Sequence, residues 1–236
     1  MVKKITIPEP EERFPFVKPL PAETLINMLI PDMPEDEKAK LARKAEDTVA
    51  DRHTCTMEEA RFRSILNGIG RPGTDKMLKQ LKVQGFFEAP ASVHYHSNWK
   101  GGLLDHSLKV YECAMTLRAQ MVADDPELES NLKPESIAIA ALLHDVCKTD
   151  EYWIDGDGNP EQIDPYFPIG GHGDKSLIKL LMWGYDLKAE EMLAIRWHMG
   201  EKNLKSAGDI KSCRRAKEIC PLCRLIIQAD HMAANA

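Results

Sequence analysis

The sequence predicts an all-α protein, a helical bundle that follows an extended, proline-rich N-terminal arm. Apolar residues recur at the spacing of helix faces along the chain after the arm, and no stretch of useful length shows the alternation typical of strands. Seven prolines fall within the first 34 residues. Because each proline fixes φ and lacks a backbone donor, this density excludes regular structure and predicts the arm.

Two helices are predicted directly after the arm. The first covers 35–51, where Glu, Lys, Ala and Leu favour helix. The second covers 56–66, because Thr56 followed by Glu59 is a capping-box signature. Glycines and a proline in 67–73 end this second helix.

The middle of the chain combines a short helix, a polar loop and a longer helix. Thr74 caps the short helix, and 90–102 is an irregular connection rich in His, Asn, Trp and Gly. From Leu103 the apolar residues step by four, three and four, which is the spacing of one helix face. His106 therefore lies near the first turn of a helix, beside a loop whose composition is typical of a functional segment.

Further helices are predicted over 136–143, 176–183, 189–199 and about 212–234. The first is apolar on nearly every side, as expected of a helix buried in the middle of a domain. Gly200 is well placed to stop the third. The stretch 154–174 holds several Gly, Pro and Asp residues, and a structureless connection of this length is typical of a lid or a binding loop.

Length and charge restrict the class of protein. At 236 residues the chain suits a core domain with an appendage, and we divide it into 1–70, an arm with a helical appendage, and 71–236, the domain that carries the chemistry. A net charge of −6 argues against an extensive duplex nucleic-acid surface but permits a basic pocket for a small phosphorylated substrate. Without a membrane-spanning stretch or a signal peptide, and with six scattered cysteines expected to be reduced, the protein is predicted to be cytoplasmic, away from membranes.

Histidine and aspartate end or interrupt the most apolar helices. The doublet His144-Asp145 closes the helix over 136–143, His198 lies near the end of another, and Asp230 follows the largely apolar run 225–229. An unpaired polar group in a core costs on the order of 1–3 kcal/mol, so a common partner is expected. A cation bound jointly by these groups would satisfy all of them.

The doublet also bears on how many ions are bound. Adjacent helix residues point about 100° apart. His144 and Asp145 can therefore bind the same metal ion only if that ion lies beyond the end of the helix, or if Asp145 reaches between two metal ions. A carboxylate that bridges two metals is the economical interpretation. Neutral imidazoles suit Fe, Mn, Zn, Co or Ni, whereas a site with fewer histidines and more water suits Mg or Mn, so one or two transition-metal ions are favoured.

The order His106, His144-Asp145, Asp230 resembles the H…HD…D signature of the HD superfamily of metal-dependent phosphohydrolases. The helical contexts of these residues match that pattern as well. The segments GGLLDHS at 101–107 and LLHDVCK at 142–148 are also similar to motifs of the family.

A second stretch narrows the resemblance to part of the family. Residues 90–96, which include His94 and His96, are similar to a bacterial and phage branch of HD hydrolases. They also resemble HD domains in a 3′-to-5′ exoribonuclease and in conjugative-relaxase proteins. The resemblance covers about 71–235 and leaves the N-terminal arm outside it.

The resemblance implies a helical HD domain that holds one or two divalent metal ions. Four residues would bind the first ion, namely His106, His144, Asp145 and Asp230. Two more look like the extra histidines of two-metal members, namely His172 and His198. In such members the aspartate of the doublet, here Asp145, bridges the two ions.

The resemblance further implies metal-assisted hydrolysis of a phosphate ester in a nucleotide or a short nucleic acid. Water at the ions would become a hydroxide nucleophile, because its pKa is lowered toward neutrality. Asp145 and Lys148 are the catalytic candidates, with Lys148 placed to neutralise the phosphoryl group. Substrate contacts are expected from His96, Lys148 and Arg196. For Lys148 the alternative is a solvated lysine favoured by a helix C-terminus.

Two other functions stay open on the same residues. A small HD branch resembling inositol oxygenase uses a similar six-ligand set around two irons to activate oxygen. A non-catalytic module would only recognise a nucleotide, and the proline-rich arm would then be its surface for a protein partner. Mixed-valent iron with oxygen consumption would favour the first, and binding without turnover the second.

Cysteines near the C-terminus offer one more candidate site. Cys220 and Cys223, with Cys213 upstream, have part of the spacing of a structural zinc site, but no fourth ligand is evident. Cys223 also enters an apolar helical run. We therefore expect buried thiols here.

Overall fold

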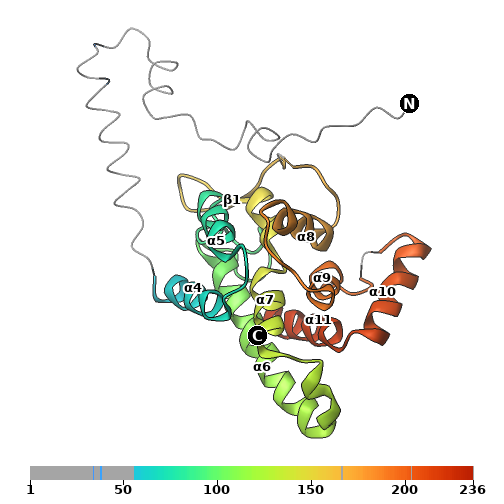
Figure 1. Cartoon of the computed structure of the whole chain (residues 1–236). Helices are drawn as coiled ribbons and strands as arrows, with labels where there is room; N and C mark the ends of the chain where they lie inside the picture. The colour runs from blue at the N-terminus through green and yellow to red at the C-terminus, as the bar shows by residue number, and fades with distance from the viewer. Residues whose placement is uncertain (1–33, 35–37, 39–55, 166, 203, 236) are drawn as a thin grey trace, which may run out of the picture. The chain divides into compact units, whose positions relative to one another are not determined.

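The computed structural model describes residues 34, 38, 56–165, 167–202 and 204–235 (Figure 1). The chain divides into two compact units, Met1–Thr56 and Met57–Ala236. The proline-rich arm and the helix predicted over 35–51 lie outside the described residues, apart from Pro34 and Lys38.

The second unit is helical, as the sequence predicted. Its α-helices are α4 (Met57–Ile69), α5 (Thr74–Val83), α6 (Gly102–Asp124), α7 (Pro134–Leu143), α8 (His172–Met182), α9 (Ala189–Arg196), α10 (Ala207–Ile219) and α11 (Pro221–Ala234). Two 3-10 helices, η2 (Pro126–Ser130) and η3 (Val146–Asp150), follow α6 and α7. None of the helices in the described ranges is long and apolar enough to cross a membrane.

Helix α7 lies at the centre of the unit. Every residue from Ser136 to Leu143 is buried, because α6 and α9 pack against α7 and α11 packs against all three (Figure 1). His144 keeps helical angles as the C-terminal cap, and Asp145, at φ −113° and ψ 22°, leaves the helix. The apolar sequence of α7 therefore delivers the doublet into the middle of the core.

Two predicted segments differ from the structure. The stretch 154–174, expected to be structureless, includes the turn and second strand of an antiparallel hairpin, β1 (Tyr152–Ile154) paired with β2 (Pro160–Gln162), and α8 begins already at His172. The single helix predicted over about 212–234 is two helices, α10 and α11. Pro221 explains the break, because it lacks an N–H and forces the preceding Cys220 into extended backbone, while it fits the first position of a new helix.

Helix α4 packs within the same unit as the helices that follow it. Its Phe62 ring lies 5.2 Å from the Phe86 ring and 5.7 Å from the Phe87 ring, centroid to centroid, and Phe62 is fully buried. The compact unit thus begins at Met57. The division between an appendage and a catalytic domain at residue 70 stays a prediction.

A buried ion pair ties the turn before α5 to α9 and α7. The Arg71 guanidinium donates to both carboxylate oxygens of Glu191, over 2.8 and 3.1 Å. Glu191 is fully buried and also accepts from the Ser136 hydroxyl at 2.7 Å and from the Lys188 backbone N–H at 2.8 Å. All the donors converge on one carboxylate, so its charge is compensated inside the core.

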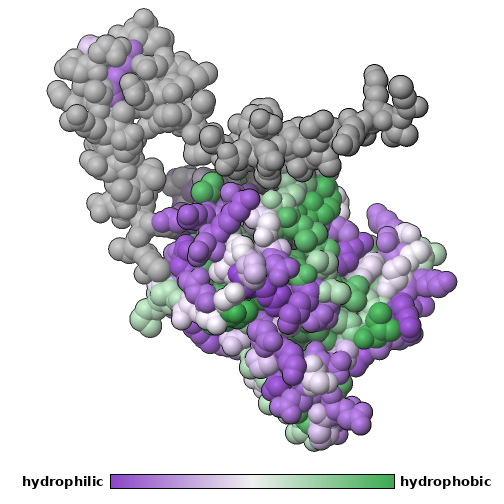
Figure 2. Space-filling model, in the orientation of Figure 1, coloured by the Kyte–Doolittle hydropathy of each residue, from purple (hydrophilic) through white to green (hydrophobic). Residues whose placement is uncertain are grey.

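The surface is mostly polar. Figure 2 shows hydrophilic residues over most of the visible face, with apolar residues gathered around α8 and the segment that leads into it. Leu181 on α8 and Ile163 in that segment are among the exposed large apolar residues. Exposed apolar residues are normal on protein surfaces.

Candidate metal centre

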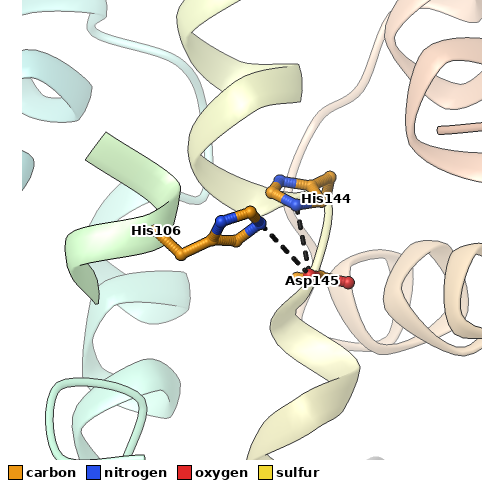
Figure 3. Close-up of side chains that lie close together, drawn as sticks. All are labelled: His106, His144 and Asp145. Atoms are coloured by element: carbon orange, nitrogen blue, oxygen red, sulfur yellow. Dashed lines mark ion pairs between the residues drawn. The ribbon is translucent and has the colours of Figure 1, made fainter. Parts of the chain in front are cut away.

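Three histidines and two aspartates from four parts of the chain meet beside the end of α7. His106 comes from the second turn of α6, the doublet His144-Asp145 follows α7, His198 follows α9, and Asp230 lies in α11. Figure 3 shows the imidazoles of His106 and His144 pointing toward the Asp145 carboxylate. The structure therefore brings together residues that are more than a hundred positions apart in the sequence.

The two oxygens of Asp145 face different histidines. Its Oδ2 lies 3.2 Å from His144 Nε2 and 3.8 Å from His106 Nε2, whereas its Oδ1 lies 3.4 Å from His198 Nε2. Asp230 Oδ1 completes the first group, at 3.1 Å from His106 Nε2 and 3.6 Å from His144 Nε2. One carboxylate thus lies between two sets of nitrogen atoms.

Backbone carbonyls orient two of the imidazoles. His144 Nδ1 lies 2.8 Å from the Ala141 carbonyl oxygen, and His198 Nδ1 lies 2.8 Å from the Ile195 carbonyl oxygen. Because a carbonyl only accepts, each Nδ1 carries the hydrogen when the ring is neutral. Each Nε2 is then left with a lone pair, which is the state that a metal ligand needs.

The centre contains buried polar atoms that hydrogen bonds do not satisfy. Within the described ranges, no hydrogen bond of good geometry is formed by Nε2 of His106, His144 or His198, nor by Asp145 Oδ1. Native proteins seldom leave such atoms without a partner. Candidate ligand atoms of His106, His144 and Asp145 lie within 4.8 Å of one another, as do those of His144, His198 and Asp230. The residues therefore fit a divalent metal ion.

The charges of the centre favour a cation as well. Burial opposes protonation of His144, but the carboxylates of Asp145 and Asp230 outweigh it and raise the His144 pKa to about 10. Burial likewise opposes ionisation of Asp145, yet Lys148 and His144 hold its pKa well below the usual range. The carboxylates thus stay charged and stabilise positive charge between them, which a metal ion supplies without a proton.

His172 belongs to a different cluster that also contains Asp145. It is the first residue of α8, and its Nδ1 lies 3.5 Å from Cys147 Sγ and 3.5 Å from Glu151 Oε2. Candidate ligand atoms of Asp145, Cys147 and His172 lie within 4.8 Å of one another. Metal binding by His172 and His198 stays a prediction, with His172 accompanied by a sulfur and a carboxylate that the sequence had not indicated.

Lys148 and His96 both border the centre. Lys148 Nζ lies 2.7 Å from Asp145 Oδ2, and the His96 ring lies 4.7 Å from the His106 ring, centroid to centroid. Burial, with help from His106 and Lys148, lowers the His96 pKa to about 4. His96 is therefore neutral near pH 7, and any contact with a substrate would be a hydrogen bond and not an ion pair.

Arg196 has other partners. Its guanidinium pairs with Asp174 of α8, lies 3.8 Å from Asp209 of α10, and stacks 4.0 Å above the Trp197 ring. These contacts join α8, α9 and α10 instead of facing the histidines. The predicted substrate contacts of Lys148, His96 and Arg196 are not tested by these positions and stay predictions.

Two residues near His172 escaped the sequence analysis, Cys147 and Glu151. Both follow the doublet closely, but no periodicity marks them. Glu151 also lies 3.2 Å from Lys175 Nζ, and the fully buried Asp150 pairs with the same ammonium group. Their only signal in the sequence is the concentration of charged residues directly after His144-Asp145, and such charges are also typical of an ordinary helix end.

Gly173 lets α8 approach α9 closely. A Cβ at Gly173 would lie 2.1 Å from the Arg196 carbonyl oxygen and 2.7 Å from that of Ile195. Real carbon atoms do not approach this closely, and the obstacle is backbone that cannot rotate away. The glycine therefore sets the distance between His172 at the start of α8 and His198 just after α9.

Gly173→Ala is expected to lower the free energy of unfolding by about 1–3 kcal/mol and to weaken metal binding at His172, because overpacking displaces backbone. Urea unfolding and metal content measure the two effects. Gly170→Ala is the matched control, since nothing lies within 4 Å of a Cβ there. If Gly173→Ala unfolded like the Gly170→Ala variant, the close approach would not be a constraint in solution.

Comparison with known proteins agrees with this geometry. The sequence description of the HD domain matches residues 103–235, more than half of the chain. Dihydroneopterin 2′,3′-cyclic phosphate phosphodiesterase from Methanocaldococcus jannaschii is 33% identical over 79 residues, which cover 34% of this chain and 30% of that relative. No solved structure matches the chain. The matched range contains every histidine and aspartate of the centre. The chain therefore belongs to the HD domain family.

Proposed function

We propose that this chain is a metal-dependent phosphohydrolase. The observation that carries the proposal is the position of Asp145, whose Oδ2 lies 3.2 Å from His144 Nε2 and whose Oδ1 lies 3.4 Å from His198 Nε2. Such a carboxylate suits a bridge between two divalent ions. The first ion would be held by His106, His144, Asp145 and Asp230, and the second by Asp145, His172 and His198.

The chain's own residues prepare the chemistry. When bound, divalent ions lower the pKa of coordinated water and withdraw negative charge from phosphoryl oxygens. The carbonyls of Ala141 and Ile195 fix the imidazoles so that their lone pairs face Asp145. Burial opposes the charge of Lys148, but Asp145 outweighs it and raises the Lys148 pKa. Lys148 thus stays positive beside the ions, where it balances charge that develops on a phosphoryl group.

The substrate proposed is a small phosphorylated compound, a nucleotide or a short nucleic acid. The archaeal relative is named for activity on a 2′,3′-cyclic phosphate, which supports a phosphodiester bond as the one cleaved. The chain spans about a third of that relative, so its pterin substrate is not carried over. The net charge of −6 favours a compact ligand at the centre over a long nucleic-acid duplex.

Metal removal is expected to lower phosphodiester hydrolysis at least about a hundredfold, because the ions supply most of the charge stabilisation. The chain would be stripped with a chelator and reloaded separately with manganese, iron(II), cobalt(II), zinc or magnesium. Phosphate release or diester cleavage is then measured with bis(p-nitrophenyl) phosphate, p-nitrophenyl phosphate and 2′,3′-cyclic nucleotides.

Two results would overturn this function. Turnover that survives complete removal of metal would exclude a metal-dependent hydrolase. Oxygen consumption by the iron-loaded chain, with no cleavage of any phosphate ester, would favour the oxygenase chemistry for which the same ligands are suited.

A further inference from the structure

Cys147 places a sulfur atom at the side of the centre where His172 lies. Its Sγ is 3.5 Å from His172 Nδ1, and its candidate ligand atom lies within 4.8 Å of those of His172 and Asp145. Cys147 itself is fully buried. Its backbone N–H donates to the Ser176 hydroxyl of α8 at 3.1 Å, which holds η3 against the helix that begins with His172.

A second, independent observation concerns the aspartate of the same cluster. Asp145 is 3% exposed, and among the described residues its Oδ1 takes part in no hydrogen bond. Oδ2 is the oxygen that faces His106 and His144, whereas Oδ1 lies 3.4 Å from His198 Nε2. A buried carboxylate oxygen that no hydrogen bond satisfies thus belongs to the residue whose candidate ligand atom lies within 4.8 Å of those of Cys147 and His172.

We propose that Cys147 is a ligand of the second metal ion and binds it through sulfur together with His172 and Asp145. The inference rests on the proposed function, since it concerns the second ion of the same centre. The S–H bond breaks when the ion binds, its proton passes to solvent, and the sulfur lone pair forms the bond to the metal. The side chain of His172 is 34% exposed, so solvent reaches this edge of the cluster.

A sulfur ligand narrows the class of ion. Thiolates are soft ligands that favour zinc, iron and cobalt, whereas magnesium and calcium prefer oxygen atoms. The second position would therefore select a transition metal even where magnesium is abundant. The first position, with two imidazoles, two carboxylates and no sulfur, would be less selective.

Cobalt(II) loading of the full-length chain tests this assignment directly. Thiolate bound to cobalt(II) gives a strong near-ultraviolet charge-transfer absorption, which imidazole and carboxylate ligands do not give. The wild-type chain is expected to show this band. Cys147→Ser and Cys147→Ala are expected to lose it and to bind the second ion at least about tenfold more weakly, so that metal content falls toward one ion per chain.

The other cysteines supply the control. Cys223 is also fully buried but lies on α11, outside the cluster with His172, so Cys223→Ser should keep the band. The serine variant at 147 preserves side-chain volume, which guards against loss of the band through misfolding, and circular dichroism checks each variant.

Two results would overturn the assignment. One is a wild-type chain that binds two cobalt ions with ligand-field absorption only. The other is a charge-transfer band that persists in Cys147→Ala. Both results leave the proposed hydrolase intact, because cobalt would still be bound and turnover could still be measured. A chain that binds no metal at all would contradict the proposed function together with this inference.

Discussion

Asp145→Asn is expected to lower the proposed phosphohydrolase activity at least about a thousandfold, which corresponds to about 4 kcal/mol of transition-state stabilisation. An amide has nearly the volume of a carboxylate, but it carries no charge and offers one oxygen. It cannot face His144 with one charged oxygen and His198 with the other, as Asp145 does at 3.2 and 3.4 Å. The variant is also expected to retain less than one ion per chain under dialysis.

The measurements are kcat/KM on the best diester substrate and metal content after dialysis. Asp124→Asn serves as the matched control, because Asp124 is an exposed aspartate at the end of α6, remote from the centre in sequence and structure. Equal activity of Asp145→Asn and Asp124→Asn would remove Asp145 from the mechanism. Retained metal with lost activity would instead point to a role in the chemical step alone.

Arg71→Met is expected to lower the free energy of unfolding by about 3 kcal/mol, because removal of one partner leaves a buried charge without compensation. Glu191 is fully buried and would keep, from the residues that the structure describes, only its hydrogen bonds from Ser136 and from the Lys188 backbone. The metal centre lies elsewhere in the bundle, so the folded variant should bind metal as the wild type does. Chemical unfolding, monitored by circular dichroism, gives the value.

An exposed ion pair provides the comparison for Arg71. The side chains of Arg215 and Glu218 are 68% and 65% exposed, so Arg215→Met should change stability by less than about 0.5 kcal/mol. The double variant Arg71→Met with Glu191→Gln should recover part of the loss, since the buried charge is gone. A loss for Arg71→Met no larger than that for Arg215→Met would show that the buried pair is not a source of stability.

Much of the fold could be predicted from local pattern. Apolar periodicity predicted α6, and the uninterrupted apolar run predicted the buried α7, because burial on one face or on all faces leaves a direct trace in the sequence. The hairpin of β1 and β2 left no such trace, since three-residue strands are too short to show alternation. The break at Pro221 could have been predicted, because proline disfavours a helix interior. The helical periodicity on both sides of Pro221 instead led to the prediction of one continuous helix.

The candidate centre was predictable for a different reason. His106, His144 and Asp145 interrupt apolar helices, where an unsatisfied polar group is costly, and this conflict between residue type and surroundings is visible without a structure. The neighbours of His172 were not visible in this way. Cys147 and Glu151 come near it only because η3 packs against the start of α8, and that packing depends on contacts such as the one between Cys147 and Ser176.

The contact between Glu151 and His172 also has a consequence for diversification. The segment from 152 to 171 leaves and returns at a single point, because Glu151 Oε2 and His172 Nδ1 are 3.5 Å apart. A loop anchored at both ends tolerates insertion, deletion and exchange with little cost to its surroundings. Evolution is therefore expected to exchange this whole segment and so change which compounds the protein recognises, while the residues of the metal centre stay in place.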